Sequence, residues 1–192
     1  MRQNSRRSVK IPNPERLRNV ALYYLSRYAA SENSLRRVLQ NRLRRAALAH
    51  PDFAADLKLQ GDLRETIEQI IASHVKTGAV NDAFLADVKV ASLRRGGKST
   101  RFIRQKLAER GLGKDHVARA LQQHDGDEGD EEADLKAALA HAKKRRLGPF
   151  RTRDADKEGI HQKDFANLAR AGFSANVIRK ILKSSGDEDF GF

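Results

Sequence analysis

The sequence predicts an all-α protein built from three tandem three-helix modules, stacked in an elongated, solenoid-like array that can curve. Two observations support this fold class. Apolar residues recur at spacings of three and four along most of the 192 residues, while strict alternation of apolar and polar residues is hard to find. A motif from the middle of the chain also returns near the carboxyl end, which indicates repeated units.

The first module is predicted over residues 14–79, after a flexible basic arm at residues 1–13. Its first helix follows two closely spaced prolines, which favour a helix start. Ser31 or Ser34 can cap the second helix, and Pro51 ends it. The helices are predicted at residues 15–30, 32–49 and 62–76, with an insertion at about residues 48–61.

The second module is predicted over residues 80–124. Polar residues that cap helix starts precede its three helices, and glycines separate them. The predicted caps are the Asn81-Asp82 pair, Ser99 and Asp115, and the breaks are Gly96-Gly97, Gly111 and Gly113. The apolar residues that the first of these helices carries are Phe84, Val88 and Ala91.

The third module, residues 133–185, lies between an acidic linker at residues 125–132 and a tail at residues 186–192. Its last two helices repeat those of the second module without gaps, at a constant offset of 61 residues. Each unit is too small to bury its own apolar faces well, so we expect neighbouring units to complete one another's cores. The matched segments are 168–174 with 107–113 and 177–182 with 116–121.

Strong positive charge restricts the partners that we expect. The 38 Lys and Arg residues exceed the 25 Asp and Glu residues, so the formal charge is +13 and the pI is about 10.3. Such a field attracts polyanions, which favours nucleic acid or an acidic protein groove as partner. Cysteine is absent, which excludes disulfides, thiolate metal sites and a Cys nucleophile. No apolar run is long enough to span a bilayer, and we expect a soluble cytoplasmic protein.

Basic residues are densest in one stretch of each module, and these are the candidate residues for binding a protein partner or phosphate. We favour the stretch in the second module, because a module with neighbours on both sides is least prone to fray. The candidates are Arg94, Arg95, Lys98, Arg101 and Arg104 in the second module, Arg36, Arg37 and Arg44 (beside Arg45) in the first, and Lys143, Lys144, Arg145 and Arg146 in the third.

Three tyrosines lie on the first predicted helix: Tyr23, Tyr24 and Tyr28. Their rings could stack on unpaired bases, as aromatic residues do in single-strand-binding proteins. Their helical spacing favours packing in the core instead.

Other features that suggest small-ligand chemistry have simpler interpretations. Residues 96–100 end like a phosphate-binding loop, but the leading glycine is missing and a helix precedes them, so a helix break capped by Ser99 is favoured. The acidic linker departs from the calcium-loop template at Gly129 and Asp130, which favours a solvated linker. The six His residues form no H-x-x-x-H pair, and no nucleophile elbow is recognisable. We therefore predict no enzyme activity, no cofactor and no metal site.

Short motifs in all three modules occur in a fixed order and spacing. They are Ala21-Leu22-Tyr23-Tyr24-Leu25, Ser31-x-x-Ser34-Leu35-Arg36-Arg37-x-Leu39, Gly78-x-Val80-Asn81-Asp82-x-Phe84, Arg94-Arg95-Gly96-Gly97, Arg101-Phe102-Ile103-x-x-x-Leu107-x-x-Arg110-Gly111, and residues 165–182. Together they resemble the RecX family over about residues 15–183. Two positions depart from the family pattern: Leu85 replaces an Ala, and residues 98–103 replace a Gly-Pro-x-Arg-Ile stretch. Both changes keep helix-start and apolar chemistry.

The resemblance implies a non-enzymatic regulator of a RecA-type recombinase, acting in DNA repair, recombination and the SOS response. It implies a monomer whose three modules lie in the groove of the recombinase filament on single-stranded DNA. There it would inhibit ATP hydrolysis, filament growth and strand exchange, with weaker direct binding to DNA.

Two other functions stay open at this point. A charge of +13 alone predicts salt-sensitive affinity for any nucleic acid, so a sequence-nonspecific nucleic-acid-binding protein without a recombinase partner is the main alternative. A sequence-specific helix–turn–helix regulator would need one defined recognition helix and usually a dimer. The repeat does not single out such a helix.

Overall fold

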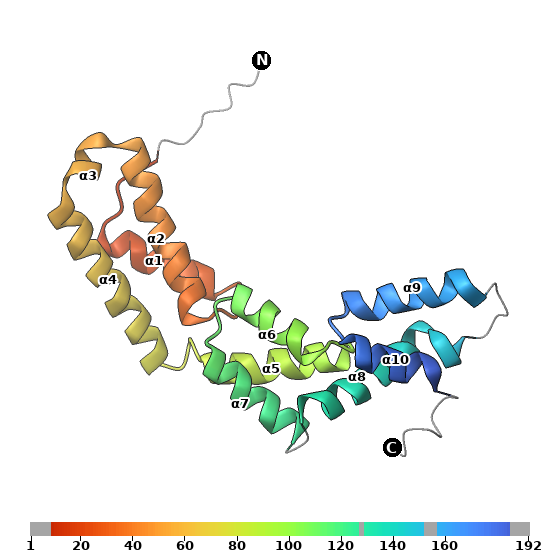
Figure 1. Ribbon diagram of the computed structural model, residues 1–192. Coiled ribbons are helices and arrows are strands. Elements are labelled where there is room, and N and C mark those ends of the chain that lie inside the picture. Colours follow the sequence, from red (N-terminus) through yellow and green to blue (C-terminus); the bar gives the residue numbers. More distant parts are fainter. Residues whose placement is uncertain (1–8, 127–128, 152–156, 185–192) are drawn as a thin grey trace. The chain divides into compact units, whose positions relative to one another are not determined.

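The computed structural model of the chain describes residues 9–126, 129–151 and 157–184. Within these ranges every regular element is a helix, so the predicted all-α class is confirmed (Figure 1). The predicted tail at 186–192 and most of the predicted arm at 1–13 lie outside the described residues. No helix in the described ranges has both the length and the apolar character needed to cross a membrane.

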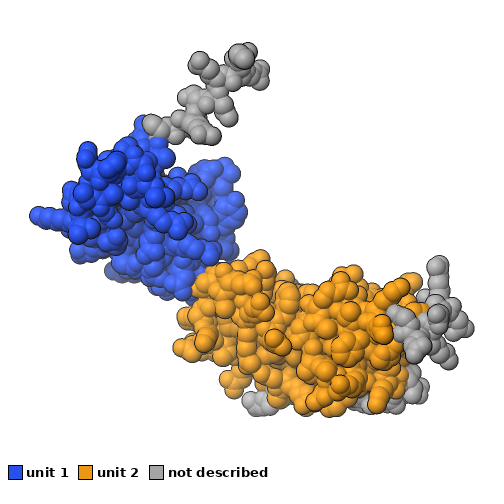
Figure 2. All heavy atoms as spheres, turned by 45° about the horizontal axis from the view of Figure 1, so that its top comes forward, with its two compact units in different colours: residues 1–85 blue, residues 86–192 orange. Residues whose placement is uncertain are grey.

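The chain divides into two compact units, residues 1–85 and residues 86–192 (Figure 2). The division falls within one helix, and the predicted module boundaries stay predictions. The helices that begin in the first unit are α1 (Pro14–Leu25), α2 (Glu32–Ala49), α3 (Pro51–Ala55), α4 (Leu57–Lys76) and α5 (Asp82–Arg95). The second unit continues with α6 (Thr100–Glu109), α7 (Lys114–Asp125), α8 (Asp130–Arg145), the short 3-10 turn η1 (Gly148–Phe150), α9 (Lys157–Arg170) and α10 (Ala175–Lys183).

The first unit encloses one apolar core. Leu35, Leu39 and Leu43 of α2 face it, as their spacing of four residues predicts, and Leu17 and Ala21 of α1 pack against them. α4 packs along α2 and closes this core. The buried apolar residues that α4 contributes are Leu63, Ile67, Ile70 and Ile71.

Capping side chains fix where several helices begin. The Ser31 hydroxyl accepts a hydrogen bond from the backbone N–H of Ser34 at 3.1 Å, so the first of the two expected caps is the real one. Ser99 caps α6 in the same way, as predicted. The prediction for α7 is wrong, because Gly113 precedes its first residue and Asp115 lies inside the first turn. A carboxylate there still interacts favourably with the helix dipole.

The insertion predicted at about residues 48–61 is itself helical. Pro51 is the first residue of α3, a position where the missing N–H of proline costs nothing. Gln60 is buried, and its side-chain amide donates hydrogen bonds to two carbonyl oxygens of α3 at 3.1 and 3.0 Å. α4 begins at Leu57, ahead of the predicted start at residue 62, because the Asp56 side chain caps it by accepting from the backbone N–H of Leu59 at 2.9 Å.

The apolar residues noted on α5 do not all face a core. Phe84 and Val88 are 66% and 46% exposed, while Ala86 and Val90 are completely buried. Ala91 is half-buried. The buried apolar residues of α5 are therefore small, which allows close packing of the neighbouring helices.

The sequence repeat of the second unit has a structural counterpart, because in both copies the first helix ends and the second begins at equivalent positions. α6 ends at Glu109 and α7 begins at Lys114. α9 ends at Arg170 and α10 begins at Ala175, which is 61 residues later in both cases. The periodicity of the sequence therefore corresponds to a repeated helix pair.

The start of α6 packs against the turn between α9 and α10. The backbone N–H of Ser99 donates to the carbonyl oxygen of Ala171 at 3.2 Å. Gly172 in this turn has a φ of +95°, and a Cβ atom on it would overlap with Ser99 and Phe102. Glycine is needed here for both the backbone conformation and the close approach.

The acidic linker predicted at residues 125–132 is mostly helical in its described part. Asp125 is the last residue of α7 and Asp130 the first residue of α8. The acids at the start of α8 occupy its first turn, which suits the helix dipole. Residues 127–128 lie outside the described residues.

Candidate partner-binding site

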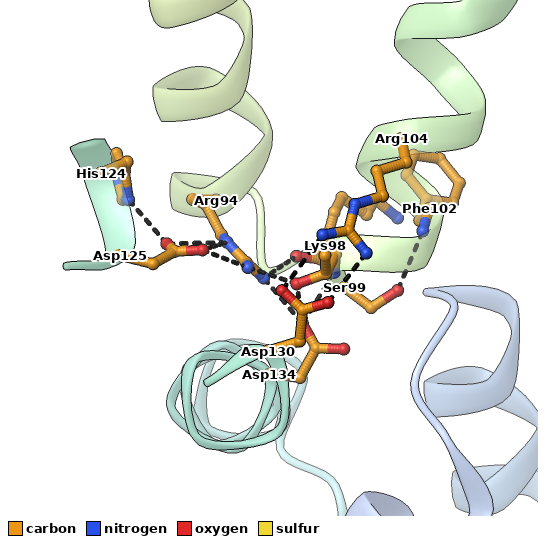
Figure 3. A network of polar contacts seen from close by, with 10 residues as sticks. Arg94, Lys98, Ser99, Phe102, Arg104, His124, Asp125, Asp130 and Asp134 are labelled. Atoms are coloured by element: carbon orange, nitrogen blue, oxygen red, sulfur yellow. Dashed lines mark hydrogen bonds and ion pairs between the residues drawn. The ribbon is translucent and has the colours of Figure 1, made fainter. Parts of the chain in front are cut away.

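Arg94, in the last turn of α5, is the centre of a buried polar network (Figure 3). The residue is 7% exposed. Its guanidinium forms ion pairs with Asp125 of α7 and with Asp134 of α8, the latter at 2.9 Å. It also donates to the hydroxyl of Thr100 at 2.6 Å and to the carbonyl oxygen of Lys98 at 3.0 Å. One side chain thus connects the end of α5 with α6, α7 and α8.

Both carboxylates of this network have a second interaction. Asp134 accepts hydrogen bonds from the backbone N–H and the hydroxyl of Thr100, at 2.7 and 2.8 Å, where α6 begins. A ring nitrogen of His124 lies 3.0 Å from a carboxylate oxygen of Asp125. Burial lowers the pKa of Arg94, but its hydrogen bonds to the two carboxylates outweigh burial, and the pKa lies above its ordinary value. The guanidinium is therefore charged throughout the neutral range.

Arg94 was predicted to bind a partner or phosphate, and the structure shows its guanidinium engaged within the protein. Its donors already bind groups of the protein, and a partner could recruit them only by leaving two half-buried carboxylates without their cation. We interpret Arg94 as a positioning residue that fixes the neighbouring helix ends. The acids around residues 125–134 are the sequence signal that could have indicated this pairing.

The other predicted residues of the second module differ in availability. Arg95 and Arg101 are exposed, and their side chains form no hydrogen bond or ion pair with the residues that the structure describes. The ammonium of Lys98 lies 4.8 Å from the centre of the Phe102 ring. Arg104 pairs with Asp130 at 2.8 Å, and both side chains are more than half exposed. Arg95 and Arg101 are thus the readily available cations of this stretch.

Four predicted cations occupy the carboxyl end of α8, at Lys143, Lys144, Arg145 and Arg146. All four are exposed. Positive charge at this position stabilises the helix through its dipole. The ammonium of Lys143 also lies 5.8 Å from the centre of the Phe150 ring. The helix end explains their placement, and their role in partner binding stays a prediction.

In the first unit, Arg36 is engaged by Glu68 of α4. Two nitrogens of the guanidinium each lie 2.9 Å from a different carboxylate oxygen. These hydrogen bonds lower the pKa of Glu68 and raise that of Arg36. Arg36 therefore forms an ion pair between α2 and α4, and its binding of a partner stays a prediction.

Arg37 and Arg44 lie on the same face of α2, two helical turns apart, and line a cavity of about 540 Å³. Arg64 of α4 lines the same cavity, and its guanidinium donates to the Gln60 side chain at 3.1 Å. Arg64 was not among the predicted residues, because only the packing of α4 on α2 brings it to this face. Three guanidiniums line this hollow of the first unit, and their combined charge attracts anions.

The tyrosines are placed differently from the core positions that we favoured. Tyr24 is half-buried and packs against the core of the first unit. Tyr23 and Tyr28 are 61% and 58% exposed, so core packing is the wrong interpretation for these two. The rings of Tyr24 and Tyr28 are 5.2 Å apart between centroids.

The glycine-rich stretch at residues 96–100 is a helix break. Ser99 accepts a hydrogen bond from the backbone N–H of Phe102 at 3.1 Å, which begins α6 and bears out the interpretation that we favoured. Among the described residues, no group of three or more His, Cys, Asp or Glu side chains is arranged to hold a metal ion.

Comparison with known proteins adds the following findings. Residues 81–121 match a family model described as RecX, second three-helix domain. Over 173 residues the chain is 38% identical to Regulatory protein RecX of Myxococcus xanthus, covering 90% of this chain and 87% of that protein. Over 172 residues it is 33% identical to Regulatory protein RecX of Agrobacterium fabrum, covering 89% and 84%. The crystal structure of RecX from Lactobacillus salivarius shares the fold, with a TM-score of 0.59, 19% identity, and coverage of 90% of this chain and 96% of that one.

Proposed function

The chain belongs to the RecX family, and from this premise we propose that it regulates a RecA-type recombinase by binding the filament that the recombinase forms on single-stranded DNA. The proposed direction is inhibition, seen as slower ATP hydrolysis, filament growth and strand exchange. The protein acts as a non-enzymatic cytoplasmic monomer, whose basic side chains contact acidic recombinase surfaces and nearby phosphates.

The observation that carries this proposal is the pair of exposed guanidiniums of Arg95 and Arg101, within the segment 81–121 that matches the family's second domain. Buried Arg94 holds the helix ends on which they lie. Because the backbone that carries these cations is already ordered, only their side chains lose conformational freedom when they meet an acidic partner. The net charge of +13 adds long-range attraction to a polyanionic filament.

Single-stranded-DNA-dependent ATP hydrolysis by the recombinase of the same organism tests the proposal. We expect substoichiometric amounts of the wild-type protein to slow hydrolysis. The double variant Arg95→Glu/Arg101→Glu should lose most of this effect without a change in thermal unfolding, because both side chains are exposed.

The matched control is Lys114→Glu/Arg119→Glu, which makes the same change of charge at exposed positions of α7. This control should keep the effect of the wild-type protein. An equal loss in both double variants would mean that net charge matters and the named surface does not. An effect that appears only at concentrations that coat naked DNA at the same salt would replace the proposal by general nucleic-acid binding.

A further inference from the structure

A second basic hollow lies in the first unit, separate from the residues on which the proposed function rests. It has a volume of about 610 Å³, within the usual range for ligand sites, and is lined by the segment before α1, by α1 and by α2. Its lining includes four cations, a tyrosine and several apolar side chains. The four cations are Lys10, Arg16, Arg42 and Arg45, and the tyrosine is Tyr23.

The wall formed by the segment before α1 is fixed by specific contacts. The Nε2 atom of His50, at the end of α2, donates to the carbonyl oxygen of Val9 at 2.6 Å. Pro12 is buried beside α1. Asn13 caps α1, since its side-chain oxygen accepts from the backbone N–H of Arg16 at 2.8 Å. The hollow is therefore preformed in the folded unit, which lowers the entropic cost of binding.

The charge of this hollow is not compensated by the described part of the chain. Lys10, Arg16, Arg42 and Arg45 are exposed, and none of their side chains forms a hydrogen bond or ion pair with the described residues. Among the described residues that line the hollow, none is acidic. Arg36 on the same helix, by contrast, is paired with a glutamate. Four uncompensated cations around a preformed hollow favour an anionic ligand.

Tyr23 adds a feature that a simple anion does not require. Its ring lines the hollow and the residue is 61% exposed. The guanidinium carbon of Arg27 lies 4.5 Å from the ring centre, in a cation–π contact that holds the ring in place. An exposed aromatic ring next to backbone-binding cations is the arrangement by which proteins stack unpaired bases.

We propose that this hollow binds single-stranded DNA, with one base stacked on Tyr23 and the adjoining phosphates on Arg42, Arg45 and Arg16. A duplex would offer the phosphates without a free base face, and it should bind less well. The carboxylates of an acidic peptide would pair with the cations but would not stack on the ring of Tyr23. This site would give the protein a direct contact with DNA that does not pass through the recombinase.

Fluorescence anisotropy with a labelled oligothymidylate of about 15 nucleotides, a length within known single-strand site sizes, tests this site without recombinase. Tyr23→Leu should weaken binding about tenfold, while Tyr23→Phe should bind within about twofold of the wild type, since both Tyr and Phe rings stack. Arg42→Gln/Arg45→Gln should weaken binding and reduce the salt slope by about 1.4, the value for two lost phosphate contacts on a single strand.

Two variants serve as matched controls in the same unit. Tyr28→Leu removes an equally exposed ring, and Arg37→Gln/Arg44→Gln removes two exposed cations of α2 that line the other hollow. Tyr28→Leu should bind the oligonucleotide more tightly than Tyr23→Leu does, and Arg37→Gln/Arg44→Gln more tightly than Arg42→Gln/Arg45→Gln. Circular dichroism verifies that every variant is folded.

Equal weakening by Tyr23→Leu and Tyr28→Leu, or equal affinity of the wild type for duplex, would overturn the proposal. Tyr23-dependent binding of an acidic peptide without binding of the oligonucleotide would assign the hollow to a protein partner instead. The recombinase assay tests a different surface, so either proposal can fail alone.

Discussion

Replacing Arg94 by Met should destabilise the protein by about 3 kcal/mol, the lower end of what removal of one partner from a buried ion pair usually costs. The side chains of Asp125 and Asp134 are only 12% and 14% exposed, so both carboxylates would lose their cation in a poorly solvated place. We expect the lower end because each keeps one neighbour, His124 or Thr100. Methionine fills most of the vacated volume, which limits any cavity contribution.

Urea unfolding followed by circular dichroism measures this loss of stability as a shift of the midpoint. Arg101→Met is the matched control, and its exposed position predicts a change within about 0.5 kcal/mol. Combining Arg94→Met with Asp134→Asn should recover part of the loss, because the second change removes an unpaired buried charge. A midpoint for Arg94→Met equal to that of Arg101→Met would refute the structural role that we assign to Arg94.

Three further predictions follow from other contacts. Arg36→Gln should lower the free energy of unfolding by about 0.5 kcal/mol at neutral pH, as expected for an exposed pair. Because Arg36 lowers the folded-state pKa of Glu68, the stability difference between wild type and variant, measured with urea, should vanish as the pH falls through that pKa. Gly97→Ala should cost about 2 kcal/mol or more in thermal unfolding, since φ is +64° and the new Cβ would lie 2.8 Å from the Cβ of His141; a wild-type melting temperature would contradict this packing. Phe84→Ser, at a position 66% exposed, should change the free energy of unfolding measured with urea by no more than about 0.5 kcal/mol, and a larger loss would mean that Phe84 is covered.

Much of the helical fold could be predicted because its signals are local. Ser31 and Ser99 cap the helices that they were expected to cap, since a cap needs only its own side chain and the next backbone N–H groups. The offset of 61 residues likewise reappears in the ends of the α6–α7 and α9–α10 pairs. The helix α3 escaped prediction because a five-residue helix is too short to show an apolar period.

The faces of α1 and α5 were harder to predict. On α1, Leu17 and Ala21 face the core, and Tyr23 follows Ala21 by two residues, which places it on the opposite side of the helix. On α5, two apolar series alternate at the same spacing, one through Phe84 and one through Ala86. Periodicity identifies both series but does not show which one a neighbouring helix will cover.

The burial of Arg94 could not be predicted for a different reason. Its carboxylate partners lie 31 and 40 residues further along the chain. Only the folded arrangement of α5, α7 and α8 brings these groups together. The same limit applies to Arg64, whose place beside Arg37 depends on how α4 packs on α2.

Under the proposed function, the basic stretch around residues 94–104 would combine two roles that experiments can separate. Loss of Arg94 acts through folding, so the remaining effect on the recombinase should follow the fraction of folded protein and recover at lower temperature or with a stabilising osmolyte. Charge reversal at Arg95 and Arg101 leaves the buried network intact, so its effect should persist under every condition in which the protein is folded. If both changes respond alike to stabilisation, Arg95 and Arg101 contribute to folding and not to recognition, and the filament contact must lie on another basic surface.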